Sequence, residues 1–236
     1  AGSAIVTINP LPVNHTVTGG GAYCSGSAGL PLGTKLSTTG VDYTLLESGL
    51  PVGTVLGGTG SALNFGVFPA GTYTIRAKNA TTGCENEGSV MMITMNTLPT
   101  QYTVTGGGNI CAGDSSSINL SGSDAGVDYQ LYNGTTMVGA PVAGGTAIDF
   151  GTHKVGGTYT VVGTDAITHC PNTMISGAVI NVTPAPVVYN VTGGGSYCAG
   201  GSGVHIKLSN SQIGVSYVLY HGSSATGYLS GTGFEL

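Results

Sequence analysis

The feature that most constrains this chain is an internal repeat with a period of 87 residues. The string Val-Thr-Gly-Gly-Gly occurs at Val17–Gly21, Val104–Gly108 and Val191–Gly195, and a cysteine follows each glycine triplet three residues later. A second string, Gly-Val-x-Tyr, recurs once per repeat in the same order. Ordered matches at one spacing indicate tandem repetition. Because about 87 residues can bury a core of their own, we expect separately folded domains rather than a continuous solenoid.

The repeat divides the 236 residues into four segments. We expect the last strand of a preceding repeat and its linker at residues 1–12, whole repeats at 13–99 and 100–186, and an incomplete third repeat at 187–236. The chain is therefore expected to be a piece of a longer array. The linkers contain proline, which restricts φ and favours extended backbone. Short, semi-rigid joints are predicted, and with them a rod-like arrangement of domains.

Within one repeat the residue pattern predicts seven strands and no helix. In the clearest strand Val41, Tyr43 and Leu45 alternate with other residues, and the same three types return in the other repeats. This face is therefore predicted to be the core face. Seven short strands, spaced about 8 to 12 residues apart, are typical of an immunoglobulin-like sandwich. Because tryptophan is absent, a fibronectin-like variant of this all-β fold class is expected. The predicted strands of the first repeat are 15–18, 34–37, 41–46, 52–56, 62–65, 73–77 and 90–95.

The five cysteines are the candidate site residues. Cys24 and Cys84 are 60 residues apart, and Cys111 and Cys170 are 59 apart. This nearly equal spacing predicts the bridges Cys24–Cys84 and Cys111–Cys170, each closed within its own repeat. Cys198 then has no partner in this chain, and one is expected about 60 residues further on. Disulfides persist in oxidising compartments, so we expect an exported protein. A thiolate metal site is the rival interpretation, but no Cys-x-x-Cys or Cys/His cluster is present.

Composition and motifs argue against several classes of function. Charged residues make up only 6% of the chain and its net charge is −5, which is unsuited to nucleic acid. No apolar run reaches the length of a membrane helix. The glycine triplets lack the Lys-Ser/Thr ending and helix of a phosphate loop, so we interpret them as turns or bulges. The histidines have no recurring serine or carboxylate partner, and the linkers lack clustered carboxylates for calcium. We predict no catalytic residue, metal ligand or cofactor, and expect no enzyme.

Several strings together carry a resemblance to a known family. They are Tyr-x-Val-Thr-Gly-Gly-Gly-x-Tyr-Cys, Gly-Val-x-Tyr-x-Leu-Tyr, Gly-Thr-Tyr-Thr-Val, the segment Asn79–Cys84 and a closing Pro-x-Pro. They resemble the tandem Ig-like repeats of very large secreted surface proteins of Bacteroidota, including gliding-motility adhesins exported by the type IX system. The resemblance covers essentially the whole chain. It implies a cell-surface or filamentous location and supplies no catalytic residues.

These observations lead to two leading hypotheses and a weaker third. In the first, the repeats form a stalk that spaces or presents the binding module of an adhesin away from the cell. In the second, they are structural subunits of an extracellular fibre, an idea that low charge and many small side chains support. A carbohydrate-binding accessory module is weaker, because tryptophan platforms are missing. The expected partners are neighbouring repeats of the same protein, like chains in a filament, or a surface or glycan ligand.

Overall fold

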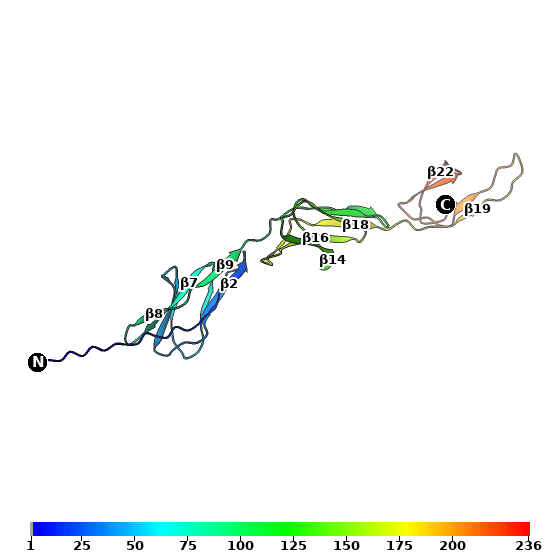
Figure 1. Ribbon diagram of the computed structural model, residues 1–236. Coiled ribbons are helices and arrows are strands. Elements are labelled where there is room, and N and C mark those ends of the chain that lie inside the picture. The colour runs from blue at the N-terminus through cyan, green and yellow to red at the C-terminus, as the bar shows by residue number, and fades with distance from the viewer. Residues whose placement is uncertain (1) are drawn as a thin grey trace. The chain divides into compact units, whose positions relative to one another are not determined.

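A computed structural model describes residues 2–236, and within them the chain is built of β-strands with no helix. The chain divides into two compact units. The first contains the residues up to Gly106 together with Ser117–Gly151 and Thr158–Ala178, so it holds the first repeat and most of the second. The other unit consists of Gly107–Ser116, Thr152–Gly157 and Val179–Leu236. Figure 1 labels the strands that are followed below.

The first repeat folds as two sheets. One sheet has the order β1-β3-β6, and the other has the order β2-β9-β7-β4-β5, with β8 paired to β7. Two separate sheets with this strand order form an immunoglobulin-like sandwich, as the sequence predicts. The strands are β1 (Val17–Gly19), β2 (Gly21–Cys24), β3 (Leu30–Thr34), β4 (Val41–Glu47), β5 (Leu50–Gly57), β6 (Leu63–Phe68), β7 (Gly71–Asn79), β8 (Glu85–Glu87) and β9 (Met91–Asn96).

The second repeat has the same architecture. Its sheets have the orders β10-β12-β15 and β11-β18-β16-β13-β14, with β17 paired to β16. Every strand of the first repeat therefore has a counterpart about 87 residues later. The strands are β10 (Val104–Gly106), β11 (Gly108–Cys111), β12 (Ser116–Leu120), β13 (Val127–Asn133), β14 (Thr136–Ala143), β15 (Ile148–His153), β16 (Gly157–Asp165), β17 (Pro171–Thr173) and β18 (Ala178–Thr183).

The described part of the third repeat contains only two strand pairs. These are β19 (Val191–Gly193) with β20 (Ile206–Leu208), and β21 (Ser216–His221) with β22 (Ser224–Ser230). Leu236 also exchanges two backbone hydrogen bonds with Leu208, at 2.8 and 3.1 Å. No strand equivalent to β7 or β9 lies among residues 187–236, so the inward face of this repeat has no cover from them.

All seven predicted strands of the first repeat are present, with two corrections to their positions. The first strand was predicted to end at the glycine triplet, but the chain continues beyond it as β2. The second was predicted at 34–37 and lies at Leu30–Thr34 instead, because Gly29 and Leu30 already follow the turn after Cys24. A short additional strand, β8, lies between the last two predicted strands.

The glycine triplet is the point at which the chain changes sheets. β1 pairs antiparallel with β3 in one sheet, whereas β2 pairs parallel with β9 in the other, as Figure 1 lets the reader follow for β2 and β9. Gly19, Gly20 and Gly21 have φ values of 94°, 73° and 107°, a region that side chains rarely adopt. The equivalent glycines of the other two repeats also have positive φ. The recurring triplet is thus explained by backbone geometry.

The predicted core face is confirmed in the two complete sandwiches. Val41, Tyr43 and Leu45 of β4 are at most 4% exposed. Their counterparts in β13 are equally buried, and side chains from the opposite sheet, such as Leu32 and Ile118, cover them. In the third repeat the counterpart of Leu45 is Leu219, which is 43% exposed. The same inward residue is therefore left open to solvent where the covering strands are not present.

Each core tyrosine also caps a backbone group. Backbone N–H groups donate to the Tyr43 hydroxyl from Thr38 at 2.9 Å and to the Tyr129 hydroxyl from Asp124 at 2.8 Å. A different tyrosine, Tyr73, donates its hydroxyl to the Pro69 carbonyl at 3.0 Å and is 1% exposed. This bond to the backbone four residues upstream is the predicted tyrosine corner.

We expect Tyr129→Phe to lower the free energy of unfolding by about 1–3 kcal/mol, because the Asp124 N–H loses its acceptor in a dry environment. Urea unfolding followed by hydrogen exchange in the second repeat measures the effect. Tyr217→Phe is the matched control, since its hydroxyl accepts the same bond from Gln212 at 2.8 Å in a partly exposed site. Equal losses for the two variants would contradict the role assigned to burial.

Candidate functional site

The most specific chemical feature of the chain is a disulfide between its first and second repeats. Cys24 of β2 is bonded to Cys170, which lies 146 residues later, between β16 and β17. The two Cα atoms are 5.5 Å apart. Cys84, Cys111 and Cys198 are free thiols. The predicted pairings Cys24–Cys84 and Cys111–Cys170 are therefore wrong, although Cys24 and Cys170 do form a bridge and Cys198 is unpaired as expected.

Strand direction explains why the pairing within one repeat fails. β2 runs parallel to β9 with Cys24 opposite Asn96, and β9 runs antiparallel to β7 with Ile93 opposite Gly71. Cys24 therefore lies beyond the end of the sheet at which β7 begins. Cys84 lies at the other end, where its carbonyl accepts a hydrogen bond from Asn79 N at 2.9 Å.

The length of β7 then separates the two sulfurs. Nine residues of strand span about 30 Å, whereas a disulfide requires Cα atoms within about 7 Å. The second repeat has the same strand order, so the same separation applies to Cys111 and Cys170. Neither repeat can close its own bridge without unfolding.

Cys24 and Cys170 meet because both lie next to the linker between the repeats. Ser25 N donates to Asn96 O at 2.8 Å, which fixes the end of β2 beside the last residue of β9. From the other side, Asn172 Nδ2 donates to Pro99 O at 2.8 Å. Only Thr97, Leu98 and Pro99 lie between Asn96 and the second repeat. The bridge therefore forms a second covalent connection beside a linker of three residues.

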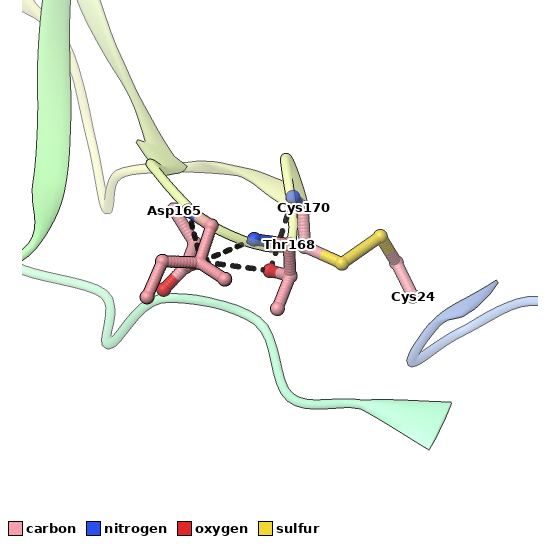
Figure 2. Close-up of a disulfide and its surroundings, with 5 residues drawn as sticks. Cys24, Asp165, Thr168 and Cys170 are labelled. Carbon is pink, nitrogen blue, oxygen red and sulfur yellow. Dashed lines mark hydrogen bonds between the residues drawn. A yellow bond between two sulfur atoms is a disulfide. The ribbon is translucent and has the colours of Figure 1, made fainter. Parts of the chain in front are cut away.

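A hydrogen-bonded turn presents Cys170 (Figure 2). The Asp165 carboxylate accepts hydrogen bonds from Ile167 N at 3.0 Å, Thr168 N at 2.7 Å and the Thr168 hydroxyl at 2.9 Å. Cys170 N in turn donates to the Thr168 hydroxyl oxygen at 3.4 Å. The bonds from Thr168, with a smaller contribution from Ile167 and His169, lower the pKa of Asp165. Because the carboxylate is the acceptor, the turn depends on its ionisation.

We expect the turn to loosen in acid. A lowered pKa in the folded state means that Asp165 stabilises the fold above its ordinary value near 3.8, and that this stabilisation is lost as the pH falls through the lowered pKa. Hydrogen exchange of Thr168 N across this pH range measures the change. Asp165→Asn should keep the turn and abolish its pH dependence, since Asn79 Oδ1 already accepts from Thr81 N and Thr82 N at 2.9 Å in the first repeat. Persistent pH dependence in this variant would assign the effect to another group.

The start of each repeat is fastened by a second recurring contact. Asp124 accepts from Thr100 N at 2.7 Å and from the Tyr102 hydroxyl at 2.8 Å. Burial acts to raise the pKa of Asp124, but these hydrogen bonds lower it overall, and the bond to Asp124 raises the pKa of Tyr102. In the third repeat Gln212 Oε1 accepts from Val187 N at 3.1 Å. The residue that follows each linker is thus bound to the domain that it enters.

Other kinds of site were sought among residues 2–236. No group of three or more His, Cys, Asp or Glu side chains is arranged to hold a metal ion in this part of the chain. None of its secondary-structure elements is a helix long and apolar enough to span a membrane. The bridge is therefore the chemical feature on which the functional argument rests.

The inter-repeat bridge could not be read from cysteine spacing alone. A chain with this period has a partner for each cysteine at about 60 residues, within the repeat, and at 146 residues, in the next one. Both choices recur equally well. Only the placement of Cys24 and Cys84 at opposite ends of the sheet separates them, and this requires the parallel pairing of β2 with β9.

Comparison with known proteins adds little beyond the fold. No protein-family profile matches the chain, and no curated protein matches it. Among solved structures, the fibronectin(III)-like modules of Clostridium thermocellum CbhA align over 71% of this chain and 95% of theirs, at 13% identity and a TM-score of 0.37. A marsupial T cell receptor covers 90% of both chains at 14% identity and a TM-score of 0.40.

A third structure contains the three N-terminal domains of the bacteriophage RB49 highly immunogenic outer capsid protein. It covers 93% of this chain and 84% of its own, at 12% identity and a TM-score of 0.33. These scores carry no argument about activity or partners. The immunoglobulin-like assignment rests on the strand order described above.

Proposed function

We propose that this chain is an extracellular repeat segment of a bacterial surface adhesin or stalk, whose repeats space or present a binding module away from the cell. The observation that carries the proposal is the Cys24–Cys170 bridge between consecutive repeats. A disulfide at this position persists only in an oxidising compartment. It supports a role in which the connection between domains matters, because it joins two sandwiches beside a linker that already joins them.

The domain boundaries belong to this proposal. We take 13–99 and 100–186 as whole domains and 187–236 as part of a third, with 1–12 as the end of a preceding repeat. Two closed cores support the first two boundaries, and the residues fastened after the linkers, Thr100 and Val187, support the starts of the second and third domains. The resemblance to Bacteroidota gliding-motility adhesins suggests export by the type IX system. No catalytic or cofactor-dependent role is proposed.

The stalk function is tested on the cells that make the protein. An antibody against the first two repeats should label intact cells, and in-frame removal of residues 13–186 should bring the outermost label closer to the cell surface. Adhesion should weaken while the protein stays exported. A deletion that leaves both label distance and adhesion unchanged would refute the stalk. Labelling only after the cells are opened would refute surface location.

One specific observation favours the alternative, a self-assembling filament. The third repeat has an open apolar groove of about 180 Å³, lined among others by Val191, Ile206, Tyr217 and Leu219. In the complete repeats β9-type strands cover this face. The segment Ala4–Asn9 matches β9 in sequence, and its apolar side chains Ile5, Val6 and Ile8 are about nine-tenths exposed. A second copy could therefore offer this segment to the groove.

A matched pair of variants tests the filament. Val6 aligns with Ile93, which is 2% exposed in β9, whereas Ile5 aligns with Met92, which is 64% exposed. If the segment docks as β9 does, Val6→Asp should abolish self-association in sedimentation experiments and Ile5→Asp should barely affect it. A chain that stays monomeric at high concentration would exclude the filament, and equal effects of the two variants would exclude this mode of docking.

A further inference from the structure

The bridge between the first two repeats raises the question of what the free cysteines on either side of it do. Cys84 and Cys111 are the positional equivalents of Cys170 and Cys24 respectively. The equivalent pair is bonded in this same structure. We propose that Cys84 and Cys111 are the two halves of further bridges of this kind, each completed by another repeat: Cys111 by the cysteine-bearing turn of the repeat that follows, and Cys84 by the β2-type strand end of the repeat that precedes.

The Cys111 half-site reproduces the surroundings of Cys24. β11 runs parallel to β18 with Cys111 opposite Thr183, as β2 does to β9 with Cys24 opposite Asn96. Ala112 N donates to Thr183 O at 2.9 Å, and Ser25 N donates to Asn96 O at 2.8 Å. Cys111 is exposed, whereas Cys170 is fully buried in the completed joint. The end of β11 thus offers an accessible thiol next to the linker that leads to the third repeat.

The Cys84 half-site reproduces the surroundings of Cys170. Asn86 Nδ2 donates to Pro12 O at 3.0 Å, as Asn172 Nδ2 does to Pro99 O at 2.8 Å. The Cys84 sulfur lies 4.0 Å from Asn9 O. Asn9 stands 87 positions before Asn96, the residue opposite Cys24.

The turn before Cys84 is also the same as the turn before Cys170. Asn79 accepts from two backbone N–H groups as Asp165 does, and Gly83 N donates to Asn79 O at the 2.9 Å found for His169 N and Asp165 O. Cys84 is therefore held beside a linker, in a turn of the bonded kind, with only the partner strand end not supplied by the first repeat.

Bridge formation is an oxidation, and the oxidant is a small-molecule disulfide. One thiolate attacks a sulfur of oxidised glutathione, breaks its S–S bond and releases one glutathione thiol. The second thiolate then attacks the mixed disulfide, forms the Cys111–Cys84 bond and releases the second glutathione thiol. Two protein thiols lose two electrons and two protons, and one glutathione disulfide gains them.

The inference deepens the proposed array function and rests on it, and its test is made on refolded protein so that either can fail alone. Residues 199–236 contain no cysteine, so the test supplies the missing turn. A second copy of residues 13–186 is inserted after Pro186 of the full chain. Cys111 of the first copy then precedes, across one linker, the Cys84 turn of the second copy.

After refolding with oxidised and reduced glutathione, peptide mapping by mass spectrometry should find Cys24–Cys170 in each copy and one additional Cys111–Cys84 link. The unduplicated chain should keep Cys84 and Cys111 open to alkylation. Cys111→Ser in the first copy should remove the additional link, whereas Cys111→Ser in the second copy should leave it intact. Non-reducing gels should show a single-chain species.

Three results would overturn the inference. They are a Cys24–Cys84 link within the second copy, alkylation of both thiols at the new joint, or a Cys111–Cys84 link found only in disulfide-bonded multimers. The last result would assign the thiols to contacts between separate chains. The same map, made on the protein isolated from its source, should show the Cys111 peptide linked to a cysteine-bearing turn of another repeat and the Cys84 peptide linked to a β2-type strand end.

Discussion

Stretching the oxidised chain from its two termini should extend it by about 500 Å less than stretching the reduced chain. The Cys24–Cys170 bridge closes a loop of 146 residues, and a fully extended residue contributes about 3.5 Å. Force applied at the ends then passes through the sulfur–sulfur bond, and both sandwiches enclosed by it stay unloaded. Single-molecule force spectroscopy with and without a thiol reductant measures the difference directly.

Two cysteine variants separate this bridge from pairing within each repeat. Cys24→Ser should give the long extension even under oxidising conditions. Cys84→Ser should leave the short extension unchanged, because Cys84 is a free thiol. If Cys84→Ser instead lengthens the chain by roughly 60 residues, about 200 Å, the bridges lie within repeats and the joint has no bridge of its own.

Gly19→Ala should lower the free energy of unfolding of the first repeat by about 3–4 kcal/mol. Two effects add. A residue with a Cβ at a φ of 94° is strained by about 1–2 kcal/mol. A Cβ at this position would also collide with the backbone carbonyl of Pro31 on β3, which no side-chain movement can relieve. The pairing of β1 with β3 must open to accept it, and hydrogen exchange in β3 and β4 reports the loss.

Gly26→Ala isolates the first of these effects. Gly26 has a φ of 97°, and a Cβ built on it meets no atom within 4 Å. This variant should therefore lose only the backbone strain, about 1–2 kcal/mol. If the two variants are equally destabilised, the close approach of β1 to β3 does not constrain Gly19, and the glycine triplet needs another explanation.

The fold was accessible from the sequence because the repeats supplied internal controls. Val41, Tyr43 and Leu45 could be assigned to the core since the same types recur where the alternate positions change, and their burial confirms the assignment. The tyrosine corner followed from the Gly-Thr step before Tyr73. Alternation of side chains is a local property of a strand, so local sequence predicts it well.

The candidate site was accessible only in part, because it depends on non-local strand order. The triplet was correctly assigned to backbone geometry, but its role in moving the chain from one sheet to the other requires the β2–β9 pairing, whose partners are 72 residues apart at Gly21 and Ile93. That crossing carries Cys24 to the end of the sheet far from Cys84. Periodicity relates residues in different repeats to one another and contains no information on which end of a domain each occupies.

The position of the bridge also bears on how the number of repeats can change over time. A cysteine that pairs one repeat onward leaves every internal joint complete when a whole unit of 87 residues is duplicated or lost. The reading frame of the disulfides is thus as tolerant of recombination between repeats as the fold itself. A deletion that begins in one repeat and ends at a different position in another would leave an odd thiol at the junction. Selection for correct oxidation would then favour genes that vary in length by whole repeats, and the reach of the protein could change without any change in its joints.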